Sequence, residues 1–182
     1  MERYRFYNDC PLYYVTFSVV NWLPVFISEA AFQIVADSLN YCHQMKSLRT
    51  NAYVIMPTHL HVICFDAEWN PERLEQTLTD FRKFTGRRLV DFCAVHLPGC
   101  FTQTMKEAAP NDRDRRFWQA TRHPVALINE TMWRQKLDYL HDNPRRKGLV
   151  RQPADWRYSS AGFYETDGAR TCDVEITRLQ WD

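Results

Sequence analysis

The sequence has little of several features that define special classes of protein. Only 5 of its 182 residues are glycine, which excludes collagen-like chains and glycine-rich linkers. Polar residues interrupt the hydrophobic runs well short of the roughly 18 residues that a membrane-spanning helix needs. The six cysteines include no C-x-x-C pair, so neither a structural zinc site nor a disulfide framework is expected. Because no signal-like segment opens the sequence, we expect one folded, cytoplasmic domain with no membrane partner.

An excess of charge of one sign is also lacking, since the formal net charge is +1. The charges are nevertheless distributed unevenly, because from residue 152 onward six acidic residues stand against three basic ones. Basic residues gather in three segments: Arg82, Lys83, Arg87 and Arg88; Arg115 and Arg116; Arg145, Arg146 and Lys147. Such clusters are typical of a solvated helix surface, and also of contacts with the phosphates of a nucleic acid.

The periodicity of apolar residues predicts alternating strands and helices. Strands are predicted over 13–20, 52–56, 59–65 and 116–119. Helices are predicted over 29–45, 71–92 and 130–143, with a short closing helix within 155–164. Residues 94–114 have mixed polarity with proline and glycine, which indicates a loop-rich insertion. This order predicts an α+β fold in which helices pack on one face of an antiparallel sheet, with the domain at 1–165 and an acidic tail at 166–182.

Two histidines share one face of a predicted strand. His59 and His61 are two residues apart, so both rings leave one face and Leu60 points to the other. Such a pair can present a metal ion, although two polar residues on a wet sheet face have the same spacing. In the third predicted helix, Tyr139 and Asn143 are four residues apart and share a face. If this face lies over the histidines, a phenol adjoins a metal held by two imidazoles and an amide oxygen.

This arrangement suits the transfer of a phosphodiester. A tyrosine phenol has an ordinary pKa of about 10 and is a weak nucleophile at neutral pH. A nearby cation favours the phenolate and polarises a phosphodiester oxygen. Attack on phosphorus would leave a phosphotyrosine and a free hydroxyl without using water, so the strand could later be rejoined to another end.

Five segments carry a resemblance to a known family. They are YVIMPTHLHV at 53–62, FWQ at 117–119, QKLDYLHDNP at 135–144, GLV at 148–150 and WRYSSA at 156–161. The first is similar to the histidine-hydrophobe-histidine motif of the single-strand HUH transposases, and the others resemble the REP-associated tyrosine transposase branch of that family. The resemblance covers about residues 10 to 165 in the right order. It implies a ferredoxin-like (RRM-like) fold with the catalytic tyrosine on a helix against the sheet.

The resemblance also implies a role for each matching residue. His59 and His61 would hold Mg²⁺ or Mn²⁺, and Tyr139 would be the catalytic nucleophile. Asn143 would be the third metal ligand, where a related branch has glutamine, and His141 is the alternative. The substrate would be single-stranded DNA with a hairpin, which the enzyme cleaves through a 5′-phosphotyrosine. The basic segments would contact phosphates, and three aromatic residues are candidates for stacking on bases: Trp22, Trp118 and Trp156.

Two other functions are compatible with the same residues. One is a domesticated, non-catalytic protein that binds hairpin DNA. The other is a metal-dependent phosphodiesterase in which water replaces the phenol and leaves a free 5′-phosphate. Only a DNA-cleaving strand transferase would link DNA covalently to the protein. The REP-associated branch implies a monomer, whereas the wider group, which completes its site within a dimer, leaves a homodimer open.

Overall fold

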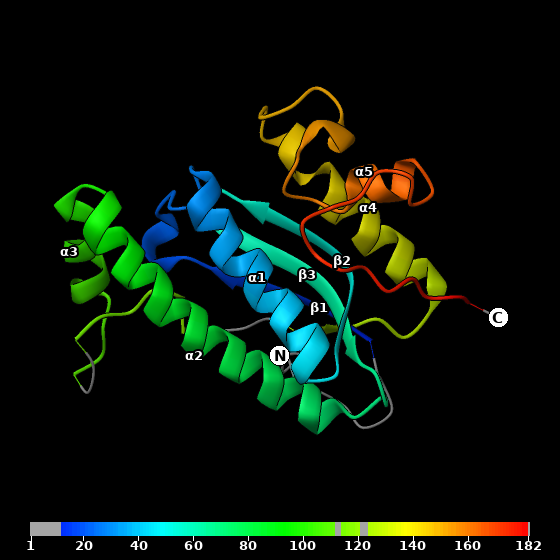
Figure 1. Cartoon of the computed structure of the whole chain (residues 1–182), viewed down its shortest axis with the longest axis horizontal. Helices are drawn as coiled ribbons and strands as arrows, with labels where there is room; N and C mark the ends of the chain where they lie inside the picture. Colours follow the sequence, from blue (N-terminus) through cyan, green and yellow to red (C-terminus); the bar gives the residue numbers. More distant parts are fainter. Residues whose placement is uncertain (1–11, 112–113, 121–123, 182) are drawn as a thin grey trace.

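The computed structural model describes residues 12–111, 114–120 and 124–181. In these residues four antiparallel strands form one sheet, in the order β2-β3-β1-β4. The strands are β1 (Leu12–Ser18), β2 (Leu48–Met56), β3 (His59–Asp66) and β4 (Val125–Ala126). The three longest helices are α1 (Glu29–Met45), α2 (Pro71–His96) and α4 (Glu130–Arg146). Figure 1 shows the resulting α+β, ferredoxin-like arrangement, which confirms the predicted fold class.

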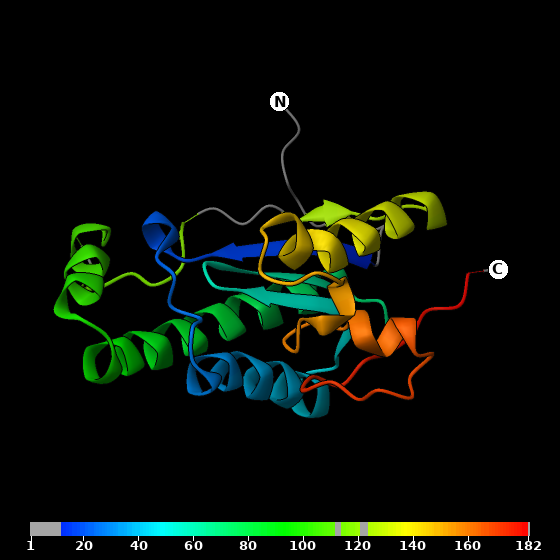
Figure 2. The ribbon, with the colours of Figure 1, turned by 90° about the horizontal axis from the view of Figure 1, so that it is seen from above.

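Helices cover both faces of the sheet, which refines the expectation that they pack on one. In Figure 2, α1 and α2 lie on one side of the strands, as predicted, and α4 lies on the other. Tyr13, Val15 and Phe17 of β1 share a core with α1 and α2, whereas Leu12 and Tyr14 share a second core with α4. The strands are therefore nearly continuous in apolar residues, which is typical of a sheet buried on both sides.

Asparagine caps explain where α2 and α4 begin. Asn70 precedes α2, and its side chain accepts a hydrogen bond of 2.9 Å from the backbone N–H of Arg73. Asn129 precedes α4 and accepts a 2.9 Å bond from the N–H of Met132 in the same way. Each cap satisfies a backbone donor that the first helical turn leaves without a partner. Both helices therefore begin where the sequence predicts.

The end of α4 differs from the prediction that the helix stops at Asn143. The helix continues through the buried Pro144 and ends at Arg146. Proline lacks the N–H that would bond to the preceding turn, but here only the last turn is affected. The N–H of Lys147 donates to the carbonyl of Asn143 at 3.1 Å and closes this turn.

The predicted loop-rich insertion at 94–114 is wrong in its first part. α2 continues to His96 because Leu89, Val90 and Cys93 extend its buried face. A further helix, α3 (Gly99–Glu107), follows and buries Met105. No helix among the described residues combines the length and apolarity needed to cross a membrane.

The predicted strand at 116–119 is wrong. This segment forms only a single β-bridge, between Trp118 and Val19, and the fourth strand of the sheet is β4. Phe117 and Trp118 are neighbours in sequence yet both are buried in the same core, which an alternating strand does not allow. The closing helix expected within 155–164 is divided into η2 (Pro153–Asp155) and α5 (Ala161–Glu165).

The C-terminal part of the chain covers the outer edge of β2. The N–H of Ile55 donates to the carbonyl of Tyr158 at 2.8 Å, and the N–H of Thr177 donates to Thr50 at 2.8 Å. Val174 is part of the core shared with α1 and α2. The described part of the predicted acidic tail therefore packs on the domain and shields an edge strand from pairing with other chains. The boundary at residue 165 stays a prediction.

A buried carboxylate holds the end of β3. Asp66 is 2% exposed and accepts hydrogen bonds from the guanidinium of Arg73 at 2.6 and 2.7 Å. It also accepts a bond from the backbone N–H of Glu68 at 2.9 Å. Burial by itself raises the pKa of Asp66, but these hydrogen bonds outweigh burial and hold the pKa below its ordinary value.

We expect Asp66→Asn to lower the free energy of unfolding by about 1–3 kcal/mol at neutral pH, since it leaves Arg73 with only the exposed Glu68, at 3.1 Å, as a charged partner. Because the folded-state pKa of Asp66 is lowered, its stabilisation is present above the unfolded-state pKa and is lost as pH falls through the folded-state value. Urea unfolding near neutral pH and at about pH 3 should show a smaller loss at the lower pH. The exposed Glu165→Gln is the control, and an equal loss at both pH values would contradict the assignment.

Candidate active site

The two predicted histidines lie side by side at the start of β3. Their ring centroids are 4.5 Å apart, and Leu60 between them is buried in the core on the opposite face. The shared face of His59 and His61 is therefore as predicted. In the sheet register His61 pairs with Thr16 and His59 with Ser18 of β1. Each histidine retains 7% of its surface exposed.

Threonine hydroxyls orient both imidazole rings. The Oγ1 of Thr16 lies 2.8 Å from the Nδ1 of His61, and the Oγ1 of Thr58 lies 2.8 Å from the Nδ1 of His59. Within the described part of the chain, the Nε2 of neither ring forms a hydrogen bond. An imidazole whose first nitrogen is held in this way presents the second one to a metal ion.

Burial keeps both imidazoles neutral. Burial, with the positive charge of Lys147 in addition, lowers the pKa of His59 to about 4. The pKa of His61 is well below its ordinary value, first because of burial, then because a second positive charge beside His59 is unfavourable, and also because of the charge of Lys136. Because both pKa values are lowered, both rings are neutral at neutral pH. Neutral imidazole is the form that binds metals.

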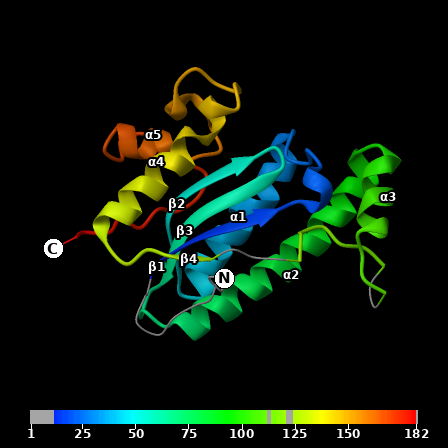
Figure 3. The ribbon, with the colours of Figure 1, turned by 180° about the vertical axis from the view of Figure 1, so that it is seen from behind.

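The helix α4 places Tyr139 beside His61. Trp133, Leu137 and Leu140 pack into the core on this face of the sheet and so determine which side of α4 faces the strands. The ring centroid of Tyr139 lies 6.0 Å from that of His61, while 42% of its surface remains exposed. Figure 3 shows α4 on this side of the molecule, running alongside β2. The predicted tyrosine and the predicted histidines therefore meet.

Two cations lie over the ring of Tyr139. The Nζ of Lys136 is 5.9 Å from its centroid, and the Cζ of Arg146 is 5.2 Å from it. Lys136 also lies 5.1 Å from the ring of Tyr14, which is stacked on His61 with centroids 5.2 Å apart. The site thus combines a half-exposed phenol, two neutral imidazoles and two positive charges.

Sequence reasoning missed Tyr14, Thr16 and Lys136 as parts of this site. The alternation of β1 places Tyr14 and Thr16 on one face, which is a signal that was present. The register that sets Thr16 opposite His61 depends on strand pairing and cannot be read from spacing. Lys136 precedes Tyr139 by three residues and shares its side of α4, so helical spacing could have found it.

The two candidates for the third ligand are in different surroundings. Asn143 lies one helical turn after Tyr139 and is 5% exposed. The Nε2 of His141 lies 2.8 Å from the Oγ of Ser160, and its ring is 5.3 Å from that of Tyr164. The Nε2 of His141 is thus already engaged. The described residues contain no group of three or more histidine, cysteine, aspartate or glutamate side chains that could hold a metal.

The structure brings only part of the predicted basic residues to this site. Arg146 lies over the ring of Tyr139, and the charge of Lys147 contributes to the lowered pKa of His59. These two residues and Arg145 lie at the exposed C-terminal end of α4. The segment Arg82, Lys83, Arg87 and Arg88 lies on α2, the helix on the opposite face of the sheet (Figure 2). Arg115 and Arg116 follow α3, and the N–H of Arg116 donates to Met105 at 2.8 Å. Their roles in DNA binding stay predictions.

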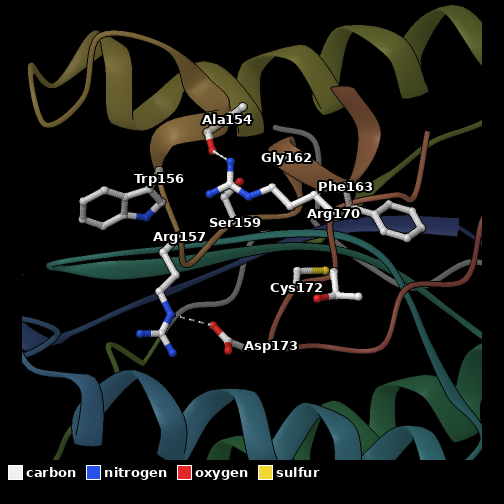
Figure 4. A pocket seen from close by; sticks show the side chains of 10 residues that line it. Ala154, Trp156, Arg157, Ser159, Gly162, Phe163, Arg170, Cys172 and Asp173 are labelled. Carbon is white, nitrogen blue, oxygen red and sulfur yellow. Dashed lines mark hydrogen bonds and ion pairs between the residues drawn. The ribbon is translucent and has the colours of Figure 1, made fainter. Parts of the chain in front are cut away.

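A separate pocket of about 140 Å³ lies where the tail meets η2 and α5 (Figure 4). Its guanidinium groups have partners in the protein. Arg170 donates to the carbonyl of Ala154 at 2.7 Å, and Arg157 lies 3.6 Å from Asp173 and 2.8 Å from Glu29. These contacts attach the tail to the domain, so the pocket has a structural explanation.

No family model matches the chain. A curated relative, the REP-associated tyrosine transposase of Escherichia coli (strain K12), is 23% identical over 145 residues, covering 76% of this chain and 73% of the relative. A solved structure of the REP-associated tyrosine transposase bound to a REP hairpin matches 100% of this chain and 95% of that one, with a TM-score of 0.64 and 19% identity. In sequence and in fold, the chain is thus similar to REP-associated tyrosine transposases.

REP-associated tyrosine transposases are the branch that the sequence motifs resemble. The structural match shows the shared fold over the whole chain, including the described tail. The sequence match spans most of the chain at low identity. The fold therefore agrees with the expectation drawn from the motifs, the sequence similarity is to the same branch, and the roles of single residues rest on the geometry of the site.

Proposed function

We propose that the protein is a single-stranded DNA endonuclease and strand transferase that acts next to hairpin DNA through Tyr139. The observation that carries this proposal is the placement of a half-exposed phenol beside two metal-competent imidazoles, 6.0 Å between the rings of Tyr139 and His61. A buried tyrosine would serve packing, whereas this one faces solvent next to groups that bind anions and metals. The curated relative and the solved structure are transposases of the same kind by name, and the latter is bound to a REP hairpin.

In the proposed reaction the oxygen of Tyr139 attacks the phosphorus of a phosphodiester. The bond from phosphorus to the 3′ oxygen breaks, the phenol proton goes to solvent, and the leaving oxygen takes up a proton to become a 3′ hydroxyl. The product is a 5′-phosphotyrosine. Lys136 and Arg146, which lie over the ring of Tyr139, would stabilise the negative charge on the phenol oxygen and the phosphate. Rejoining is the reverse attack by another 3′ hydroxyl.

The residues present fit a divalent cation. His59 and His61 offer neutral rings with Nδ1 held and Nε2 without a hydrogen bond among the described residues. We propose that Asn143 is the third ligand, since the Nε2 of His141 is engaged by Ser160. Mg²⁺ or Mn²⁺ would polarise the phosphate oxygen, and few protein ligands leave positions for the substrate. Imidazole ligands generally suit ions softer than Mg²⁺, so the chemistry of the ligands leaves the identity of the metal open.

The experiment that tests the proposal looks for protein-linked DNA. Wild-type protein is incubated with labelled single strands that carry hairpins flanking its own gene, with Mg²⁺, Mn²⁺ or EDTA. Denaturing gels should show a metal-dependent band of lower mobility that disappears after proteinase digestion. Binding without such a band would favour the domesticated hairpin binder. Cleavage to a free 5′-phosphate without an adduct would favour the phosphodiesterase that uses water.

We also propose that the protein acts as a monomer.

We expect Lys136→Met to slow adduct formation by about 10- to 100-fold, because it removes one of the two charges over Tyr139 and keeps the length of the side chain. Single-turnover rates at saturating DNA measure the effect. The control is Lys46→Met, a similar change at the exposed C-terminal end of α1, the helix on the opposite face of the sheet. Equal rates for Lys136→Met and wild type would remove Lys136 from the site.

A further inference from the structure

An exposed tryptophan adjoins the candidate active site on the side away from Tyr139. Trp22 ends the short helix η1 (Val20–Trp22), which directly follows β1. Its side chain is 55% exposed, and its ring lies 5.8 Å from that of His59 at an interplanar angle of 83°. The two histidines therefore stand between two exposed aromatic rings, Trp22 next to His59 and Tyr139 next to His61.

The backbone holds Trp22 in an unfavourable conformation. Asn21 and Trp22 have φ angles of 49° and 55°, in the left-handed region that a bulky side chain rarely adopts. The segment is attached to the turn that carries His59, because the N–H of Val19 donates to the carbonyl of Thr58 at 2.9 Å. The N–H of Trp22 donates in turn to Val19 at 3.0 Å. Strain of this kind in a bulky, exposed residue points to a use outside folding.

The other tryptophans considered for base stacking are occupied. Trp118 is 3% exposed, and its Nε1 donates to the Oγ1 of Thr85 at 3.0 Å. The Nε1 of Trp156 donates to the carbonyl of Ile55 at 3.0 Å. Trp118 lies in the core and Trp156 is partly buried against it, whereas Trp22 is exposed at the active site.

We infer that Trp22 stacks on an unpaired base of the single strand, next to the phosphodiester that Tyr139 attacks. This inference rests on the proposed function, and it adds a base subsite on the His59 side. An aromatic face accepts any base, so the subsite would hold the strand without selecting a sequence. A phosphate at the histidines would have one neighbouring nucleotide over Trp22, which fixes the strand relative to the attacking oxygen.

Trp69 offers a matched control at the other end of the same strand. It is 49% exposed, has a φ of 59°, and stacks on Phe65 with centroids 4.6 Å apart. Phe65 is near the end of β3, whereas His59 begins that strand. Trp69 thus shares the exposure and the backbone conformation of Trp22 but lies away from the candidate site.

The test measures binding of a fluorescein-labelled hairpin with single-stranded extensions, in EDTA so that no cleavage takes place. We expect Trp22→Ala to raise the Kd by about tenfold or more, and Trp69→Ala to change it by less than about twofold. Trp22→Gly should bind as weakly as Trp22→Ala while its unfolding midpoint stays at or above that of the wild type, because glycine adopts this φ without strain. Equal Kd values for Trp22→Ala and Trp69→Ala would overturn the inference.

Abasic sites in the extension locate the base. One position should lower the affinity of the wild type but not that of Trp22→Ala, as expected for two groups that act as a pair. Absence of any such position would also overturn the subsite. Adduct formation in Mg²⁺ or Mn²⁺ is assayed separately with the wild type. If no adduct forms, the proposed function fails, and the Kd values still show whether Trp22 stacks on the strand.

Discussion

Tyr139→Phe is expected to abolish covalent attachment of DNA, a loss of at least about a thousandfold, and to leave hairpin binding within about twofold. The hydroxyl is the attacking group in the proposed reaction, whereas the ring alone makes the contacts with His61 and Arg146. Phenylalanine keeps these contacts and loses only the nucleophile. Denaturing gels measure the adduct, and fluorescence anisotropy with the same hairpin measures binding.

Tyr41→Phe is the matched control for this variant. Tyr41 is 56% exposed on α1, on the opposite face of the sheet from α4, so we expect it to form adducts at the wild-type rate. The neighbouring Tyr14 is 5% exposed and would not replace Tyr139 as the nucleophile. Adducts that persist in Tyr139→Phe would show that another residue attacks, and the proposed mechanism would be wrong.

His61→Ala is expected to reduce adduct formation by at least about a thousandfold and to remove most of the affinity for Mn²⁺. Its Nε2 is one of two ring nitrogens offered to the metal, and its ring adjoins both Tyr139 and Tyr14. Adding His59→Ala to this variant should reduce adduct formation little further, because the effects of substituting residues that act as one unit are not additive. Isothermal titration with Mn²⁺ and the adduct assay measure the two effects.

Thr16→Val tests the orientation of the His61 ring while His61 itself is kept. The variant keeps the size of the side chain and removes the hydroxyl that lies 2.8 Å from Nδ1. We expect Mn²⁺ affinity and adduct rate to fall by about 10- to 100-fold while the fold is retained. His141→Gln should leave Mn²⁺ affinity unchanged, because the Nε2 of His141 faces Ser160. Retention of full Mn²⁺ affinity by His61→Ala would contradict the metal site.

The parts of the fold that could be predicted are those that depend on neighbours along the chain. The alternation around Leu60 placed both histidines on one face, and helical spacing placed Asn143 one turn after Tyr139. The wrong predictions have a common cause, which is that local composition does not show how a residue packs in the folded chain. Phe117 and Trp118 suit a strand by composition, but the core takes up both rings on one side. Pro144 is a helix breaker in general, but it lies within the last turn of α4.

The sequence by itself determined the α+β class, the histidine pair and the family resemblance, because strand and helix periodicity act over a few residues. Only the tertiary structure decided that α4 lies on the histidine face, with Tyr139 next to His61 and His141 turned to Ser160. It also set Thr16 opposite His61 and placed the basic residues of α2 in the other layer. These contacts join residues far apart in the chain, so they follow from strand register and from the burial of two separate cores, which local spacing does not encode.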